Sequence, residues 1–228
     1  MTEPVVEPVV EPGAGSAPLV AVVDYGIGNL HSAHKALCRM GADARLTTDP
    51  GLIAAAAAVV LPGVGAFAAC MAALRAAGLE EPVRAAAGSG RPFLGICVGM
   101  QMLFTSSDEV DADGRTTEGL GVIPGVVRWL PPGVKRPQMQ WNLLEVTRPD
   151  DPMLAGLEHD AWVYFVHSLH GVPDDPTVVA ATCDYGGTVN AAFRLGEVFA
   201  TQFHPEKSSE AGLRLLGNFV AVAAAVAA

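Results

Sequence analysis

Short apolar runs alternate with stretches of helical spacing through the first half of the chain. The runs are rich in Val, Leu and Ile and almost free of charge, which is typical of strands buried on both faces of a sheet. We expect strands at 19–26, 57–63 and 91–96, and helices at 28–41, from the Ala-rich region to about 88, and from 99 onward. This alternation predicts an α/β fold with a mostly parallel central sheet flanked by helices.

The second half has a different pattern. Short β-rich runs separated by turns extend from about 125 to 203, and a longer apolar stretch over 210–226 predicts a closing helix. Runs joined by short turns favour antiparallel pairing. We therefore expect an antiparallel, β-rich second half attached to the parallel sheet.

Residues 1–18 differ from the rest of the chain. They contain an imperfect EPVV repeat, several prolines and no aromatic residue. Proline lacks the backbone donor that regular structure uses, and such a composition resists compact burial. We expect a disordered tail over 1–18 and a single domain over 19–228.

Charge and composition narrow the range of partners. The 228 residues carry a net charge of −10, which argues against nucleic acid, because binding to phosphates requires Lys and Arg. The uncharged stretch 50–74 has the length of a membrane span, but Pro62 and the glycines beside it would break a spanning helix. We interpret it as a strand, a loop and a helix. With its first basic residue at Lys35, the chain is expected to be cytoplasmic.

The four cysteines show no CxxC or other metal-ligand spacing, so we expect neither a metal nor a cofactor. A reducing cytosol is the default for such a chain, without disulfides. Cys38, Cys70 and Cys183 are interpreted as small buried hydrophobic residues.

Cys97 is different because it lies between Gly95 and Gly99, where a predicted strand meets a predicted helix. A sharp strand-to-helix turn forces the residue at its corner into strained backbone angles, and glycines two positions away remove Cβ atoms that would clash. This arrangement predicts a nucleophile elbow that presents the thiol. The alternative is a core cysteine beside incidental glycines.

A base for that thiol is found near the C-terminus. The strand-like stretch 197–203 leads directly to His204, and Glu206 follows two positions later. A thiol nucleophile needs a base to take its proton, and the base needs a carboxylate to orient it. Residues two apart in extended chain face the same side, so Glu206 can reach the His204 ring. Taken alone, a His-Pro-Glu sequence is usually a surface turn.

A glycine-rich loop, LPGVGAF at 61–67, follows another predicted strand. Ligands bind at the carboxyl ends of parallel strands. Gly63 and Gly65 allow close approach of the backbone, and we expect the amides of Gly65 and Val98 to hold a developing oxyanion. An ordinary strand-to-helix turn is the alternative.

These motifs together resemble the class I glutamine amidotransferases. Within that group they are similar to the glutaminase subunits of imidazole glycerol phosphate synthase. The resemblance covers about 19–220 and implies a flavodoxin-like α/β fold. The segments that carry it are DYGIGNLHSAHKAL (24–37), PGVGAF (62–67), GICVGMQMLF (95–104), WN (141–142), YFVHS (164–168) and QFHPEKS (202–208).

The resemblance implies a role for each matching residue. Cys97 would attack the side-chain amide of L-glutamine, and His204 would protonate the departing ammonia and then activate water. Gln101 and Glu109 would hold the amino-acid end of the substrate. Gly63, His167 and Ser168 would flank the same pocket.

The resemblance also implies a partner. In such enzymes the ammonia passes to a cyclase subunit, a TIM barrel in a heterodimer, which makes imidazole glycerol phosphate and aminoimidazole carboxamide ribonucleotide in histidine biosynthesis. The glutaminase is nearly silent until the cyclase binds its substrate. Matching positions near the docking face are Trp141, Asn142, Tyr164 and Lys207.

Two residues depart from the pattern of these subunits. Gln140 stands where glycine is usual, and Leu169 where an aromatic residue is usual. Both concern docking or the pocket rim and leave the chemistry of Cys97 untouched.

Other interpretations stay open at this stage. The chain could be the glutaminase of a different synthase, or a non-catalytic scaffold subunit with the same fold. The glycine-rich turn at 24–29 could bind phosphate, although it lacks a full GxGxxG pattern. A tight turn near the partner interface is the preferred interpretation of that segment.

Overall fold

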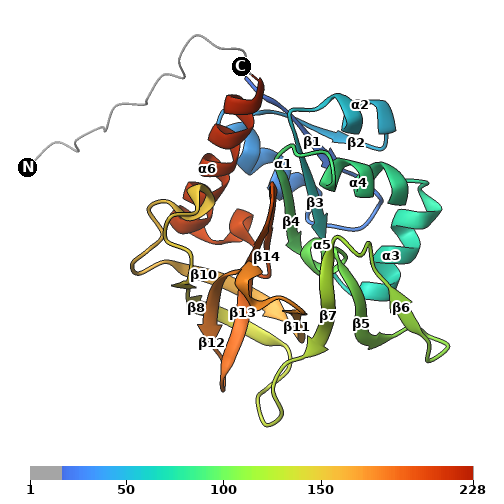
Figure 1. Cartoon of the computed structure of the whole chain (residues 1–228), viewed down its shortest axis with the longest axis vertical. Coiled ribbons are helices and arrows are strands. Elements are labelled where there is room, and N and C mark those ends of the chain that lie inside the picture. The colour runs from blue at the N-terminus through green and yellow to red at the C-terminus, as the bar shows by residue number, and fades with distance from the viewer. Residues whose placement is uncertain (1–16, 228) are drawn as a thin grey trace, which may run out of the picture.

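The structure is a computed structural model that describes residues 17–227. Most of the expected tail over 1–18 lies outside the described residues. The described chain forms one large sheet with helices on both faces and two smaller sheets at one end (Figure 1).

The large sheet has eight strands in the order β2-β1-β3-β4-β14-β13-β12-β9. The strands β1, β2, β3, β4 and β14 pair in parallel, and β14, β13, β12 and β9 pair antiparallel. Their bounds are β1 Leu19–Val23, β2 Asp43–Thr47, β3 Ala58–Gly63, β4 Phe93–Cys97, β9 Glu145–Val146, β12 Val179–Asp184, β13 Thr188–Leu195 and β14 Val198–Thr201. The expected combination of a parallel sheet with an antiparallel second half is confirmed.

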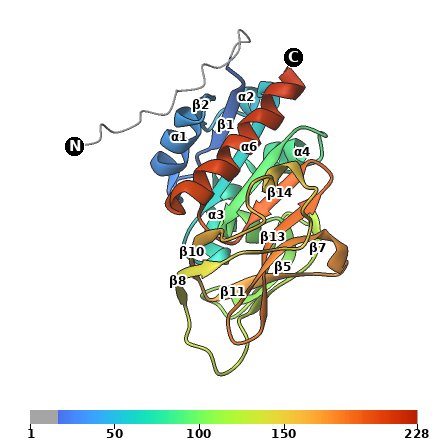
Figure 2. The same ribbon diagram turned by 90° about the vertical axis from the view of Figure 1, so that its left-hand side faces the viewer.

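Helices cover both faces of this sheet. Helices α1 (Leu30–Arg39) and α6 (Ser209–Ala227) contact each other and lie side by side (Figure 2). Helix α2 (Pro50–Ala55) contacts α4 (Glu80–Ala87), and α3 (Phe67–Ala76) precedes α4. Right-handed crossovers between parallel strands place successive helices on opposite faces when the strand order reverses, as it does after β2. The strands β3 and β4 are therefore buried throughout.

The two smaller sheets extend the fold beyond the carboxyl ends of β3 and β4 (Figure 1). The four-stranded sheet has the order β11-β7-β5-β6, and β8 pairs with β10 as a two-stranded ribbon. Their bounds are β5 Phe104–Val110, β6 Thr116–Glu118, β7 Ile123–Trp129, β8 Gln138–Leu143, β10 Trp162–His167 and β11 Leu169–Pro173.

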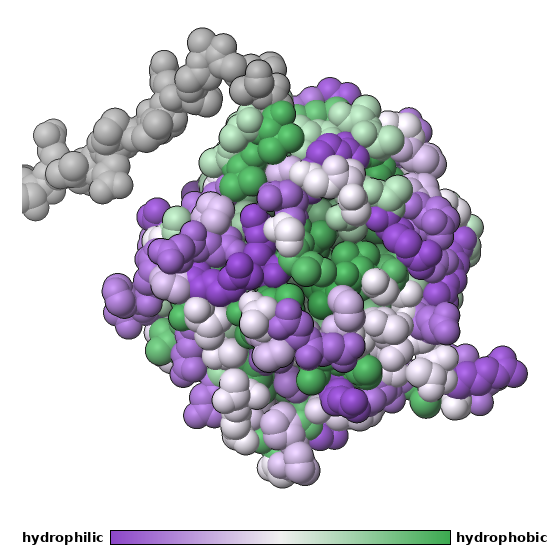
Figure 3. All heavy atoms as spheres, viewed as in Figure 1, coloured by the Kyte–Doolittle hydropathy of each residue, from purple (hydrophilic) through white to green (hydrophobic). Residues whose placement is uncertain are grey.

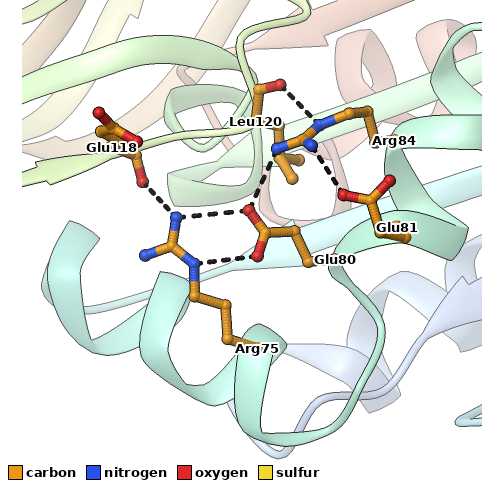
Figure 4. Close-up of polar contacts among 6 residues, drawn as sticks. All are labelled: Arg75, Glu80, Glu81, Arg84, Glu118 and Leu120. Atoms are coloured by element: carbon orange, nitrogen blue, oxygen red, sulfur yellow. Dashed lines mark hydrogen bonds and ion pairs between the residues drawn. The ribbon is translucent and has the colours of Figure 1, made fainter.

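An exposed polar cluster fastens the α3–α4 corner to the four-stranded sheet (Figure 4). Arg75 pairs with Glu80 at 3.0 Å and also donates to the carbonyl of Glu118. Arg84 pairs with the same Glu80 and donates to the carbonyl of Leu120. Exposed ion pairs individually contribute little to stability. These guanidinium groups also donate to backbone carbonyls, which holds the α3–α4 corner in position against the sheet.

Several predicted elements differ in the structure. The Ala-rich region forms two helices, α3 and α4, and the prediction missed strand β2 and helix α2. The helix expected from 99 is a single turn, α5 (Val98–Gln101), and Phe104 already begins a strand. Tertiary contacts end that helix, because the carbonyls of 102–104 accept hydrogen bonds from the amides of 120–123.

The interpretation of the cysteines was right at two positions and wrong at one. Cys70 and Cys183 are buried, as expected, whereas Cys38 is exposed. Its neighbour Leu37 is fully buried. Successive residues on a helix point about 100° apart, so the burial of Leu37 turns Cys38 toward solvent.

By length and composition, α6 could cross a membrane, with 18 suitable residues over 209–226. A third of that window is buried in the fold, and its large apolar residues Leu215, Leu216 and Phe219 belong to the core. The length of this helix is therefore accounted for by packing. On the face seen in Figure 3, hydrophobic residues gather at the C-terminal end of α6 and near the middle, between polar surroundings.

Candidate active site

Cys97 occupies a strained corner between β4 and α5. Its backbone angles are φ 54° and ψ −113°, a combination that side-chain-bearing residues rarely adopt. The two flanking glycines are required by contact: a Cβ on Gly99 would lie 1.9 Å from the carbonyl oxygen of Leu61, and one on Gly95 would lie 2.9 Å from the Leu103 side chain. The elbow expected from the sequence is present.

The glycine-rich loop lies directly beside this corner. In the parallel register of β3 and β4, Gly63 pairs with Cys97. A Cβ on Gly63 would lie 2.6 Å from the Gly99 amide nitrogen, so only glycine allows this approach. Gly65 has φ +89° and lines the same pocket as Val98. Among the described residues, neither the Gly65 nor the Val98 amide donates to a turn or loop carbonyl.

Strand β14 brings the C-terminal motif to the other side of the corner. Thr201 pairs with Ile96, so the chain beyond β14 continues past the level of Cys97. His204 is buried, with 1% of its surface exposed. The glycine-rich loop, the elbow and the C-terminal motif are distant in sequence and meet because β3, β4 and β14 are neighbours in one parallel sheet.

His204 and Glu206 form a buried pair. Nδ1 of His204 lies 2.8 Å from Oε1 of Glu206, and both side chains are at most 2% exposed. Burial alone would lower the pKa of His204, but hydrogen bonding and charge from Cys97 and Glu206 outweigh it and raise that pKa to about 9. Burial would raise the pKa of Glu206, whereas hydrogen bonds from His204 and Asn29 lower it.

The other ring nitrogen of His204, Nε2, is free to exchange a proton. Within residues 17–227, Nε2 is buried and has no partner that meets hydrogen-bond geometry. Because Glu206 accepts at Nδ1, Nε2 is the atom available to exchange a proton with the Cys97 thiol. Such contacts are commonly long in unliganded active sites and tighten when substrate binds.

Two buried amides continue from the thiol: Gln101, which was predicted, and Gln202, which sequence reasoning missed. Gln202 is fully buried, and its Nε2 approaches the Cys97 sulfur at 3.8 Å. Gln101 donates to Gln202 Oε1 at 3.0 Å and to the Leu169 carbonyl at 3.1 Å. Both Gln101 donors are therefore used within the protein, and its carbonyl oxygen is left for a ligand. The position of Gln202 two residues before His204 was the available signal.

His167 presents a single acceptor to the same space. Its Nδ1 donates to the Leu169 carbonyl at 2.7 Å, so Nε2 carries no proton in the neutral ring. That Nε2 is buried without a partner among the described residues. Burial is the main cause that lowers the pKa of His167 to about 4, so the ring is neutral at physiological pH. The departure at Leu169 leaves this arrangement intact because only its carbonyl takes part.

Glu109 reaches the pocket from β5. Its Oε2 accepts a hydrogen bond of 2.5 Å from the amide of Phe67, the first residue of α3. Ala66 cannot cap that helix, so Glu109 takes the place of a capping side chain. Ser168 joins β10 to β11 and lines the pocket beside His167.

These side chains line one pocket of about 620 Å³. That volume is suitable for a small-molecule ligand. Cys97 and His204 are both on its wall, so no layer of packed side chains separates the thiol from the imidazole. Other predicted residues on the wall are Gly65, Val98, Gln101, Glu109, His167, Ser168 and Lys207. In the part of the chain that the structure describes, no group of three or more His, Cys, Asp or Glu could hold a metal ion.

An exposed apolar face lies next to this pocket. On the β8–β10 ribbon, Trp141 is opposite Tyr164, and their rings are 6.1 Å apart. Large apolar residues on the same side of the ribbon are unusually exposed: Met139 62%, Trp141 45%, Leu143 37% and Trp162 52%. We call these four residues, together with Tyr164, the ribbon face. Asn142 points to the opposite side and donates to the Asp184 carbonyl.

Comparison with known proteins gives a consistent result. Residues 21–223 match the family model described as glutamine amidotransferase class-I. The chain is 52% identical over 204 residues to "Imidazole glycerol phosphate synthase subunit HisH" of Synechococcus sp. (strain JA-3-3Ab), covering 88% of this chain and 92% of that protein. It is 49% identical over 210 residues to the protein of the same name in Syntrophotalea carbinolica, covering 88% and 98%.

Solved structures share the fold at lower identity. The structure of PurLQS from Thermotoga maritima aligns with a TM-score of 0.70 and 19% identity, covering 90% of this chain and 98% of that one. A crystal structure of a glutamine amidotransferase aligns with a TM-score of 0.64 and 23% identity, covering 89% and 98%. At these identities the likeness concerns the fold alone.

Proposed function

The chain belongs to the class I glutamine amidotransferase family, and from this premise we propose that it is the glutaminase subunit of an imidazole glycerol phosphate synthase. Its relatives of that name are about half identical to it over most of both chains. The substrate is L-glutamine, and the products are glutamate and ammonia. The observation that carries the proposal is the single pocket shared by Cys97, His204 and the loop at Gly65.

The first half-reaction forms a thioester. The proton of the Cys97 thiol is held on His204 Nε2, and the sulfur attacks the side-chain carboxamide carbon of glutamine. The negative charge that develops on the carboxamide oxygen is stabilised by the amides of Val98 and Gly65. His204 then gives its proton to the nitrogen, and ammonia leaves. Glu206 stabilises the imidazolium while that proton is held.

The second half-reaction releases glutamate. A water molecule gives a proton to His204 as its oxygen attacks the thioester carbon, and the sulfur departs and regains the proton. Hydrogen-bond acceptors on the pocket wall suit the amino-acid end and the amide of glutamine, which offer N–H donors. They are the carboxylate of Glu109, the carbonyl oxygen of Gln101 and Nε2 of His167. Ser168 lines the pocket beside them, whereas Gly63, also expected there, is not on the pocket wall and instead pairs with Cys97 in the sheet.

The partner in this proposal is a cyclase subunit of the TIM-barrel class, in a heterodimer. The ribbon face would dock against it, because a contiguous exposed apolar patch is typical of protein interfaces. Trp141 and Tyr164 are on that face, Lys207 is at the pocket rim, and Asn142 supports the ribbon from behind. Ammonia would pass to the cyclase, which makes imidazole glycerol phosphate in the cytoplasm.

The test combines the chain with a candidate cyclase and its nucleotide substrate. Glutamine-dependent synthesis is expected, with much faster glutamine hydrolysis in the complex than in the isolated chain. The Cys97→Ser variant should lose glutamine-dependent synthesis and keep synthesis from added ammonium salts. Unchanged use of glutamine by that variant would refute the role of Cys97, and failure of the wild type to hydrolyse glutamine in any complex would refute the proposed function.

A further inference from the structure

Asn29 is joined to the buried carboxylate of Glu206 across 177 positions of sequence. Its Nδ2 donates to Glu206 Oε1 at 3.0 Å, and this is the oxygen that lies 2.8 Å from His204 Nδ1. Oε1 therefore accepts from two donors, whereas Oε2 is buried without a partner in the described part of the chain. The two donors together set the plane in which the carboxylate lies.

The chemistry of the contact fixes the orientation of the Asn29 amide. A carboxylate only accepts hydrogen bonds, so the NH2 group must face Glu206 and the amide oxygen must point away. The donor adds no charge to the buried pair. An amide thus orients the carboxylate without competing with His204 for its charge, which a lysine or arginine at this place would do.

The position of Asn29 in the fold shows what this contact displaces. Asn29 is the N-cap of α1, where asparagine normally accepts a hydrogen bond from the first turn of its own helix. Its side chain makes no such bond. On α2 the equivalent residue, Asp49, does cap its helix, accepting from the Gly51 amide at 2.8 Å. The side chain of Asn29 is therefore committed to Glu206 instead of to α1.

Asn29 also lies on the wall of the pocket that holds Cys97 and His204, next to Gly28. The sequence alone indicates no role in the reaction for the turn that carries it, 24–29. The first turn of α1 and the short segment that contains Glu206, Pro205–Lys207, are in contact. The glycine-rich turn thus delivers a second donor to the Glu206 oxygen that His204 also contacts.

We propose that Asn29 is a positioning residue of the active site, which holds the Glu206 carboxylate in the orientation that His204 requires. Its side-chain amide donates to Glu206, and it acts through that carboxylate. The inference rests on the proposed glutaminase function for its effect on rate, and on the Asn29–Glu206 contact alone for its effect on the carboxylate.

The decisive variant is Asn29→Ser in the full-length chain. Serine is as good an N-cap as asparagine, so α1 is kept, but its hydroxyl is too short to reach Glu206. The melting temperature should stay level or rise. Loss of a hydrogen bond to a charged group should lower kcat for glutamine by about ten- to a hundredfold, with KM changed less than about twofold. The acidic limb of the pH profile should move to higher pH, because Glu206 loses a donor that favours its ionised form.

Asp49→Ala is the matched control. It removes a side chain that does cap its helix, so it should lower the melting temperature and leave kcat and its pH profile unchanged. The proposal is overturned if Asn29→Ser keeps the wild-type kcat and pH profile, or if its kcat falls only in proportion to a loss of folded protein.

A substrate-free measurement separates this proposal from the proposed function. The carboxyl carbon of Glu206, followed by NMR, should titrate at higher pH in Asn29→Ser than in the wild type. That shift is expected whether or not glutamine is the substrate. An unshifted titration in Asn29→Ser would overturn the role of Asn29. If the variant shows the shift but the wild type hydrolyses no glutamine, the proposed function alone is overturned.

Discussion

Gly63, the last residue of β3, lies directly beside Cys97, the last residue of β4, in the register of two parallel strands. The loop expected to hold the oxyanion and the corner that carries the thiol are therefore placed by the same backbone ladder. No side-chain contact is needed to bring them together. The geometry of the site depends on glycine at 63 and 99, because a Cβ atom at either position would clash with neighbouring backbone.

The strain at Cys97 predicts an unusual order of stability among variants. Glycine adopts positive φ without penalty, whereas alanine shares the strain of cysteine. We expect Cys97→Gly to be more stable than Cys97→Ala by about 1–3 kcal/mol, the reverse of the usual order in regular structure. Urea unfolding of the two inactive proteins measures the difference. If Cys97→Ala is the more stable, the corner is not strained in solution.

Close packing between the elbow and β3 predicts the effect of a single methyl group. Alanine at Gly99 would bring Cβ to 1.9 Å from a backbone oxygen that cannot move aside without distorting β3. We expect Gly99→Ala to cost more than about 4 kcal/mol or to prevent folding. Gly88→Ala is the control, because a Cβ there meets nothing closer than 3.6 Å. Thermal unfolding of both variants tests this, and equal melting temperatures would contradict it.

The pKa of His204 predicts the alkaline limit of activity. Cys97 and Glu206 raise that pKa to about 9 against the effect of burial, so the imidazole carries a proton at neutral pH. Since ammonia leaves by taking this proton, kcat/KM should fall as the pH rises through about 9. In Cys97→Ser the imidazole should titrate at lower pH, which NMR of the ring can follow. An imidazole that titrates near its ordinary value in the wild type would contradict this assignment.

Three buried histidines predict a stability maximum near pH 6.5. Burial lowers the pKa values of His167 and His170 to about 4, so below 6.5 the unfolded chain binds more protons and stability falls toward pH 4. The pKa of His204 is raised, so its contribution is fully present below 6.5 and is lost as the pH rises through about 9. Urea midpoints measured from pH 4 to 10 test both limbs. Cys97→Ser should flatten the alkaline limb and leave the acidic limb unchanged.

The ribbon face predicts which surface residues affect the partner. Trp141→Ala should weaken co-purification with a cyclase, because Trp141 is a large aromatic residue in the middle of an exposed apolar face. Aromatic anchors of this kind commonly contribute 2 kcal/mol or more, which is roughly a thirtyfold loss of affinity. Val110→Ala is the control, since Val110 is similarly exposed but lies on β5. Calorimetric titration measures both, and equal affinities would exclude this face.

The sequence was sufficient for the parts of the site that are set by local backbone chemistry. Gly95, Cys97 and Gly99 predict the elbow because their spacing has a steric reason, and His204 and Glu206 predict a pair because they are two apart after a strand. The order of β3, β4 and β14 then brings these motifs together. The parallel strands β1, β3 and β4 were predictable because they are almost entirely apolar, whereas β2, with the sequence DARLT, was not.

Other features depend on contacts that no local pattern encodes. The one-turn helix α5 ends where the amides of 120–123 donate to the carbonyls of 102–104. Asn29 has the sequence position of a helix cap, and only the fold shows that its side chain is directed to Glu206. Gln202 precedes His204 by two residues, but only the fold shows that its side chain approaches the Cys97 sulfur.

Strand β10 has two different environments on its two sides. Its alternate residues Val163, Phe165 and His167 are buried toward the core, and His167 borders the pocket, while Tyr164 and Trp162 are on the ribbon face. Both sets of side chains are attached to one backbone. We therefore expect a partner docked on the ribbon face to contact the same strand that carries His167 on the pocket wall.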